Sequence, residues 1–362
     1  MNVLLLRANP RKTGQTQQLI DWFVQGVRET DARLVEVDLT TRSLLPCLGC
    51  YHCWLTTPGQ CVHGDDMGEL LERILEAEVL VCASPLYHFS MSSYLKVFFE
   101  RTFPLLKQGL TGSGLGFTRN NLRYPDRWEG KKLVTLLTGA LRGLEPYRPA
   151  NETFRLIADS LDLELGGQLS RPESYLIDYP FSKPKTLKRI RAAFRQAGRE
   201  TGQTGRLSPE TEADAALPLS SDDERFRAYS NLYWNQAEAL GEDGLVPAEV
   251  QKRVAHDVRI LLREMVQSFD ARAAARLRAV LQFDFPDCDR HFRVRIDRGE
   301  CRLEEGRADQ PDLRIECTAE VWAGIFTRQI AVREALRNRQ LVLDGDKSLF
   351  TRLDRYFPPP SA

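Results

Sequence analysis

Five short apolar runs, separated by segments with helical spacing, dominate the first half of this 362-residue chain. The first run, for example, precedes a stretch in which Leu19, Ile20, Phe23 and Val27 fall on one helical face. Alternating strand and helix signals are typical of a parallel sheet joined by right-handed crossovers. We therefore expect an α/β fold with a doubly wound, five-stranded parallel sheet. The expected strands are Asn2–Arg7, Arg33–Asp38, Val79–Ala83, Lys132–Thr138 and Leu163–Leu169.

Composition excludes several classes of function. Lysine plus arginine and aspartate plus glutamate number 50 each, so no net charge attracts nucleic acid or an anionic membrane. The N-terminal apolar run is shorter than a signal peptide, and no run reaches the roughly 20 residues of a membrane helix. We expect a cytoplasmic protein without membrane insertion or nucleic-acid binding. The basic stretch Lys185–Arg199 is interpreted as a solvated amphipathic helix.

A polar loop, ANPRKTGQT, follows the first expected strand and precedes a helix. Backbone N–H groups at a helix N-terminus favour an anion, and Arg11, Thr13 and Thr16 add donors. The loop has neither a dinucleotide-binding nor an ATP-binding glycine pattern. The alternative is an ordinary polar turn in which Thr16 caps the helix.

Two more loops end at the same edge of the expected sheet. The strand Val79–Ala83 leads into Pro85-Leu86-Tyr87-His88-Phe89, and the strand Lys132–Thr138 ends at Thr138-Gly139. Open α/β sheets bind ligands at the carboxyl ends of their strands. The pattern predicts a ligand site there, although Tyr87, His88 and Phe89 are equally compatible with ordinary loop and core positions. No obligatory acid or base is evident, so the catalytic residues stay unknown, with Tyr87 and His88 as the best candidates.

Four cysteines have the spacing C-x2-C-x2-C-x7-C, at Cys47, Cys50, Cys53 and Cys61. In a large chain without an export signal, such a cluster indicates metal or redox chemistry and not a disulfide framework. Thiolates suit iron–sulfur clusters and zinc alike, and free or redox-active thiols are the third interpretation. The x7 gap departs from ferredoxin spacing. The loop histidines offer substitute ligands: His52, His63 and His88.

Together, NPRKTGQT, PCLGCYHCWLTTPGQCVHGDDM and ASPLYHFSMSSYLKVFFER resemble the flavodoxin-like NAD(P)H-dependent FMN reductases, above all the iron–sulfur flavoproteins, over roughly residues 1–239. The resemblance implies FMN, NAD(P)H as cosubstrate, a [4Fe–4S] cluster on the four cysteines, and a homodimer. It implies electron transfer from NAD(P)H or a protein donor to a quinone-like small molecule or an iron–sulfur acceptor. The residues that match the FMN loops are Asn9, Arg11, Thr13, Gly14, Gln15, Thr16, Pro85, Leu86, Tyr87, His88, Phe89, Thr138 and Gly139.

The pattern changes in the last third of the chain. The segment Gly241–Pro247 predicts a boundary between domains at 1–245, with a helical extension from about residue 206, and 246–362. Beyond it, short strands and helices resemble an α+β sterol carrier protein type 2 (SCP2-like) domain over roughly residues 249–357. The resemblance implies an apolar tunnel for a hydrophobic ligand, faced by Val321, Trp322, Ile325, Phe326 and Leu349.

Two alternatives follow from this C-terminal pattern. The apolar residues could instead form a filled core, in which case the domain mediates assembly or covers the flavin. If the tunnel exists, the chain could instead be a lipid carrier or sensor with a redox-reporting N-terminal domain.

Overall fold

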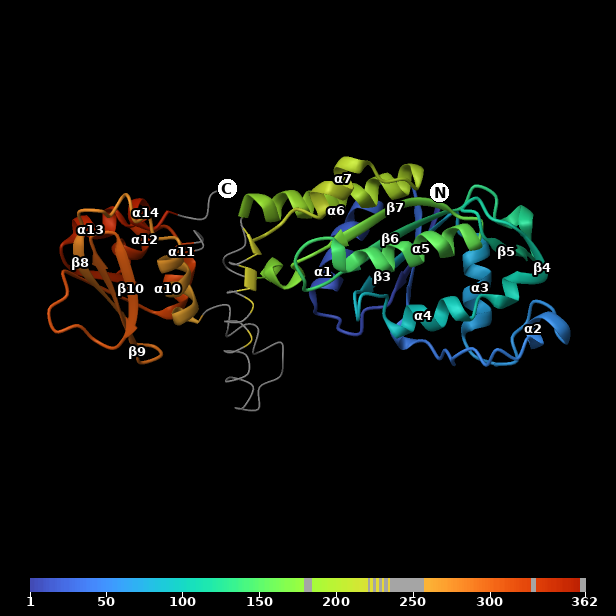
Figure 1. Ribbon diagram of the computed structural model, residues 1–362, viewed down its shortest axis with the longest axis horizontal. Coiled ribbons are helices and arrows are strands. Elements are labelled where there is room, and N and C mark those ends of the chain that lie inside the picture. Colours follow the sequence, from blue (N-terminus) through green and yellow to red (C-terminus); the bar gives the residue numbers. More distant parts are fainter. Residues whose placement is uncertain are drawn as a thin grey trace. The chain divides into compact units, whose positions relative to one another are not determined.

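A computed structural model of the chain divides into two compact units (Figure 1). It describes residues 1–178, 184–220, 257–326 and 330–358, together with isolated positions between 222 and 234. The first unit comprises Met1–Ile177 and Pro184–Leu219, and the second comprises Asp178–Lys183 and Ser220–Ala362. The expected boundary at 245/246 lies outside the described residues.

The first unit is built on five parallel strands in the order β2-β1-β3-β6-β7. This flavodoxin-like order confirms the expected fold and brings the carboxyl ends of β1, β3 and β6 next to one another. In the central strand β3 every residue is buried, as expected for a parallel sheet covered on both faces. The strands are β1 (Asn2–Arg7), β2 (Arg33–Asp38), β3 (Val79–Pro85), β6 (Lys132–Thr138) and β7 (Glu164–Arg171).

Helices cover both faces of this sheet because successive strand residues point to opposite sides. On one face, Leu4 and Leu6 join a core with α3 (Met67–Glu76), α4 (Ser93–Glu100) and α5 (Arg148–Ser160). α1 (Gln15–Val27) and α6 (Pro184–Thr204) pack together outside that core, and α7 (Pro209–Ala215) contacts α6 and β7 (Figure 1). The α1–α6 contact is close, since a Cβ on Gly26 would lie 1.8 Å from the Arg195 carbonyl oxygen.

Between β3 and β6 the chain forms more structure than the sequence suggested. The segment Lys107–Trp128, expected as a polar excursion, instead contributes most of a hairpin of β4 (Leu106–Gly112) and β5 (Thr118–Leu122). Trp128 at its end is fully buried in the core. The cysteine segment adds one short helix, α2 (His52–Leu55). The short 3-10 helices of this unit are Leu39–Thr41, Phe103–Leu105, Pro125–Arg127, Glu145–Tyr147 and Ser174–Asp178.

The second unit is a mixed five-stranded sheet in the order β10-β9-β8-β11-β12. β8 and β11 pair in parallel, and the other neighbours are antiparallel. In β9 buried residues alternate with more exposed ones, whereas the last five residues of β8 are all buried. Phe283, Phe285 and Phe292 are almost fully buried. The strands are β8 (Arg278–Phe285), β9 (Arg290–Asp297), β10 (Glu300–Glu305), β11 (Leu313–Cys317) and β12 (Leu341–Gly345).

The helices of this unit are short. The C-terminal segment forms two of them, α13 (Lys347–Thr351) and α14 (Leu353–Tyr356). At the start of α11, the Val321 N–H donates to Thr318 Oγ1 at 3.2 Å, and this bond caps the helix. The other helices are α10 (Val258–Gln267), α11 (Ala319–Phe326) and α12 (Val332–Arg337).

Candidate functional site

Three loops meet at the carboxyl ends of β1, β3 and β6, and we call them the strand-end loops. They comprise residues 8–16, 84–90 and 138–139. The Leu86 N–H donates to the Thr138 carbonyl at 2.6 Å, which joins the second loop to the third. Ser92 Oγ donates to the Ala8 carbonyl at 2.9 Å, which joins the segment after the second loop to the first. The predicted FMN residues are therefore brought to one edge of the sheet.

The first loop is organised around Asn9, which is 2% exposed. Its Nδ2 donates to the Arg11 carbonyl at 3.0 Å and to Gln17 Oε1 at 3.1 Å. Its buried Oδ1 has no partner in the described part of the chain. Such an atom is costly to bury unless a ligand or water satisfies it.

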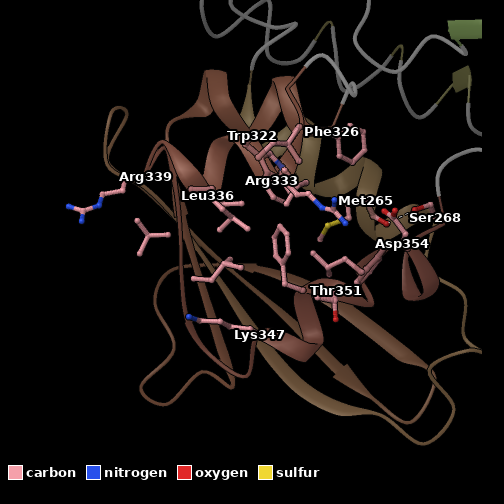
Figure 2. Close-up of a pocket in the computed structure, with 18 residues that line it drawn as sticks. Met265, Ser268, Trp322, Phe326, Arg333, Leu336, Arg339, Lys347, Thr351 and Asp354 are labelled. Atoms are coloured by element: carbon pink, nitrogen blue, oxygen red, sulfur yellow. Dashed lines mark hydrogen bonds between the residues drawn. The ribbon is translucent and has the colours of Figure 1, made fainter.

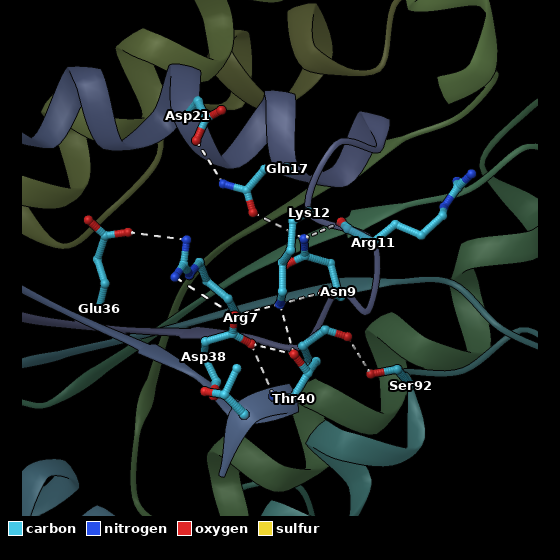
Figure 3. Close-up of polar contacts among 12 residues, drawn as sticks. Arg7, Asn9, Arg11, Lys12, Gln17, Asp21, Glu36, Asp38, Thr40 and Ser92 are labelled. Carbon is cyan, nitrogen blue, oxygen red and sulfur yellow. Dashed lines mark hydrogen bonds and ion pairs between the residues drawn. The ribbon is translucent and has the colours of Figure 1, made fainter. Parts of the chain in front are cut away.

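The two cations of this loop differ in their environment (Figure 3). Lys12 Nζ bonds Asp38 and Thr40, and although burial opposes it, this contact lowers the pKa of Asp38. Arg11 extends away from that cluster in Figure 3, and no ion pair involves it among the described residues. Its Nε would lie 3.4 Å from a Cβ placed on Gly14. Arg11 is thus the cation of this loop available to an anion at the start of α1.

The predicted role of Thr16 as the helix cap is wrong. α1 begins at Gln15 with Gly14 as its N-cap, and no side chain caps it. Thr16 lies inside the first turn, where its Oγ1 is 2.5 Å from Thr138 Oγ1. This contact joins the first and third loops directly, and the helix N-terminus keeps no side-chain cap of its own.

The second loop has a strained backbone. His88 and Phe89 have φ of 46° and 62°, and Tyr87 and Ser90 exchange two backbone hydrogen bonds of 2.9 Å. Positive φ in non-glycine residues is uncommon and concentrates at ligand sites. Tyr87 and Phe89 are each 50% exposed, so the structure does not place them in the core, which was one of the interpretations left open.

The third loop rests on two residues that sequence reasoning missed. Tyr147 Oη donates to the Arg171 carbonyl at 2.8 Å, and Gly139 N–H donates to the same carbonyl at 3.1 Å. The side chains of Tyr147 and Arg171 are fully buried. Burial raises the pKa of Tyr147 and lowers the pKa of Arg171 to about 10. A Cβ on Gly139 would lie 2.6 Å from Tyr147 Oη, so the loop needs glycine there. In the sequence, the only hint of this contact is Arg171, two residues after the expected strand Leu163–Leu169.

The four clustered cysteines line one small cavity of about 90 Å³, the cysteine cavity. Cys53 is the most buried; burial raises its pKa, as do the charges of Cys61, Cys47 and Cys50. No three His, Cys, Asp or Glu side chains of the described residues are arranged to hold a metal ion. His63 also lines the cavity, whereas His52 and His88 do not.

A buried ion pair that the sequence analysis missed fixes both ends of the cysteine segment. Arg101 Nη1 and Nη2 donate to the two Asp65 oxygens at 2.7 and 2.9 Å, with the side chains 1% and 5% exposed. Arg101 also donates to the Leu45 carbonyl at 2.6 Å, and Asp65 accepts from Leu45 N–H and Met67 N–H. Burial opposes ionisation of Asp65, but these donors lower its pKa to about 2. The sequence pattern suggests that Asp65 caps α3, but this prediction is wrong: the N-cap is Asp66, and no side-chain hydrogen bond caps the helix there.

The second unit holds a larger, apolar cavity of about 1130 Å³, the apolar cavity. Trp322, Ile325 and Phe326 line it as expected, whereas Val321 and Leu349 are not among its lining residues. Figure 2 shows the Arg333 side chain extending across the cavity toward Met265. Two further cations, Arg339 and Lys347, line it with one carboxylate, Asp354.

Neither unit contains a membrane-spanning candidate: among the helices that the structure describes, none combines the length and apolarity needed to cross a bilayer.

Two protein-family models match this chain, one in each unit. Residues 1–145 match the family described as NADPH-dependent FMN reductase, and residues 261–358 match the SCP-2 sterol transfer family. An iron–sulfur flavoprotein of Archaeoglobus fulgidus is 27% identical over 104 residues, which are 29% of this chain and 46% of that protein. One of Methanocaldococcus jannaschii is 30% identical over 105 residues, 29% of this chain and 53% of that protein. The chain thus spans about half the length of these curated relatives.

Solved structures with a similar arrangement cover a little more than half of this chain. An FMN-dependent NADH-azoreductase from Bacillus anthracis, in complex with FMN, is 12% identical with a TM-score of 0.43. It covers 56% of this chain and 99% of its own. An NAD(P)H:quinone oxidoreductase from Methanothermobacter marburgensis is 17% identical with a TM-score of 0.41, covering 55% and 96%. This chain thus joins an N-terminal region that matches the model of the NADPH-dependent FMN reductase family to a C-terminal region that matches the model of the SCP-2 sterol transfer family.

Proposed function

We propose that the chain is an FMN-dependent oxidoreductase that takes electrons from NAD(P)H and passes them to a quinone-like small molecule. The observation that carries the proposal is the meeting of the three strand-end loops at one sheet edge, within the region that matches the FMN reductase family. A bound FMN would supply the hydride and electron transfer chemistry.

The residues of these loops suit the parts of FMN. The start of α1, with no side-chain cap, and the Arg11 guanidinium suit the phosphate. The buried, unpartnered Asn9 Oδ1 suits a hydroxyl donor of the ribityl chain. The exposed Tyr87 and Phe89 rings suit the flavin ring, which needs an aromatic wall open to an acceptor. Tyr87 and His88 stay the proposed donors near the ring.

The test is FMN binding by the purified full-length chain, followed by anaerobic addition of NADPH or NADH. We expect stoichiometric flavin uptake, bleaching of the oxidised flavin absorption by one of the two donors, and reoxidation by a water-soluble quinone. A chain that takes up no FMN would disprove the proposal. Flavin that binds and is reduced but is not reoxidised by quinones would disprove only the choice of acceptor.

We propose further that the cysteine cavity holds a [4Fe–4S] cluster. Support comes from four thiols lining one cavity and from the two relatives named iron–sulfur flavoproteins. Thiolate is the ligand that such clusters require, although zinc also accepts it. Anaerobic reconstitution with iron and sulfide should load the wild-type chain and the Cys288→Ser control, but not a Cys53→Ser variant. Zinc uptake without sulfide, or loading that survives Cys53→Ser, would contradict the cluster.

A second function is proposed for the C-terminal unit: binding of an amphiphile with an anionic headgroup. The apolar cavity has the volume of a ligand site, and Arg333, Arg339 and Lys347 line it without an ion pair among the described residues. Uncompensated cations beside apolar walls favour a carboxylate or phosphate on an apolar chain. This function is also what the carrier interpretation of the chain requires.

Displacement of a fluorescent fatty acid tests this binding. We expect a fatty acid to compete at least about tenfold better than the alcohol of the same length, a difference of about 1.4 kcal/mol. Arg333→Gln should remove most of that preference, whereas Arg352→Gln, outside the cavity lining, should preserve it. Equal competition by acid and alcohol in the wild type would contradict the anionic headgroup.

We also propose that the chain forms a homodimer. Three apolar side chains of the cysteine segment, Leu48, Leu55 and Val62, are 50–73% exposed, which is unusual for large apolar residues close together in sequence. Light scattering of the purified chain should give twice the 41.3 kDa chain mass. A mass of one chain at micromolar concentration would contradict the dimer.

A further inference from the structure

The cysteine cavity contains a fully buried positive charge whose role is not explained by its ion pair alone. Arg101 lines the same cavity as Cys47, Cys50, Cys53 and Cys61 and is 1% exposed. Its Nη1 and Nη2 are occupied by Asp65 and the Leu45 carbonyl. Its Nε is buried and has no hydrogen-bond partner among the described residues. The Nε–H of this rigid, charged group is thus a buried donor left for something else in or beside the cavity.

The orientation of this donor is fixed. The two Asp65 oxygens hold the guanidinium from one edge in a bidentate pair, so the planar group cannot rotate without breaking both bonds. Burial lowers the pKa of Arg101, yet Asp65 and Cys61 raise it overall. Among the cavity cysteines, it is Cys61 that contributes to this rise.

The other charged groups at this cavity do not offer the same donor. Glu100 lines it, but its carboxylate is bound by Lys96 Nζ at 2.6 Å on the surface of α4. His63 lines it with Nε2 3.2 Å from the Pro46 carbonyl oxygen. Of the lining residues that the structure describes, Arg101 is the charged group that is fully buried.

We propose that Arg101 is the counter-charge of the cysteine cavity, with its Nε–H donating to the sulfur of Cys61 when that thiolate is a cluster ligand. This inference rests on the proposed cluster. Four thiolates around a [4Fe–4S] core leave a net negative group, and reduction adds one further negative charge. A nearby positive charge and a hydrogen bond to sulfur both stabilise the reduced form, so they raise the reduction potential. Asp65 holds Arg101 in place and, being negative, opposes part of this effect.

If Arg101 and Asp65 act in this way, their variants should shift the midpoint potential of the cluster in opposite directions. Arg101→Gln removes the positive charge and should move the cluster midpoint potential to more negative values, and Arg101→Lys, which keeps the charge but loses Nε, should move it less. Asp65→Asn removes the negative charge while keeping one acceptor for Arg101, and should move the potential to more positive values. A purely structural role would not give shifts of opposite direction.

The experiment is a redox titration of the reconstituted full-length chain, monitored by the visible and electron paramagnetic resonance signals of the cluster. The matched control is Arg123→Gln: Arg123 donates to the Cys53 carbonyl at 3.3 Å but does not line the cavity, so its loss should leave the potential unchanged. FMN content and circular dichroism check that each variant is folded.

Three results would overturn the inference: no shift in Arg101→Gln, shifts of the same sign in Arg101→Gln and Asp65→Asn, or an equal shift in the Arg123 control. A wild-type chain that binds FMN but incorporates no iron and sulfide would overturn the inference and the proposed cluster together. It would leave the proposed flavin function standing.

Discussion

The strand-end loops and the cysteine cavity are built on opposite principles, although one helix connects them. α4 begins after Ser92, which bonds the first loop, and is followed by Arg101 in the cysteine cavity. Its eight residues rise by about 12 Å. At the first end, separate neutral hydrogen bonds join the loops, one between backbone groups and two from side-chain hydroxyls. At the other end, one buried side-chain pair holds both ends of the segment.

The difference determines how each site should respond to substitution. A site joined by several separate neutral hydrogen bonds loses little when one of them is removed. A site that depends on one buried ion pair should fail when either partner is removed, because the remaining charge is left buried. Each of the following predictions separates the two regions by this criterion.

The largest effect is expected for Asp65→Ala. It leaves Arg101 buried without its carboxylate, which should lower the free energy of unfolding of the first unit by about 3–5 kcal/mol. Chemical denaturation, followed by release of FMN, measures it. The neighbouring Asp66→Ala is the control: the Asp66 carboxylate accepts from the Ser43 N–H at 2.9 Å, and its loss should cost at most about 1.5 kcal/mol. Equal losses would show that the ion pair does not organise the segment.

This pair also shows the limit of sequence reasoning here. Apolar periodicity placed the five strands correctly, and a strand-end rule located the loops, because both signals are local in the chain. Arg101 and Asp65 are 36 positions apart, and nothing in their spacing predicts contact. Tyr147 and Arg171 were missed for the same reason. Thr16 was misassigned because Gly14 occupies the cap position that a hydroxyl residue usually takes.

The second prediction concerns acid. The pKa of Asp65 in the folded chain is about 2, below the ordinary value of 3.8, so its carboxylate stabilises the fold above about pH 4. That stabilisation, about 2 kcal/mol, should be lost as the pH falls from about 4 to about 2. Unfolding curves of the wild type and Asp65→Asn should converge over this range. If their difference stayed constant down to pH 2, the carboxylate would not be held by these donors.

The third prediction concerns Gly139 in the third strand-end loop, where a larger side chain would not fit. In Gly139→Ala the new Cβ would lie 2.6 Å from Tyr147 Oη and 3.3 Å from Leu86 Cβ, so the third loop must shift. FMN affinity should fall about tenfold, or about 1.4 kcal/mol. Tyr147→Phe in the same chain removes the clashing oxygen and should restore part of the affinity. Gly64→Ala, where a Cβ meets open space, should change nothing.

The smallest effect is expected for Thr16→Val, which keeps the shape of the side chain but removes the 2.5 Å contact with Thr138 Oγ1. One hydroxyl bond contributes about 1 kcal/mol, so FMN affinity should fall roughly fivefold. The unfolding free energy should change by less than about 1 kcal/mol, because the Leu86–Thr138 backbone bond and the Ser92–Ala8 bond remain. Titration of the two variants Thr16→Val and Thr13→Val with FMN compares a residue that joins two loops with an exposed one of the same loop. A larger loss in Thr13→Val would mean that side-chain donation to the ligand, and not the junction between loops, governs this edge of the sheet.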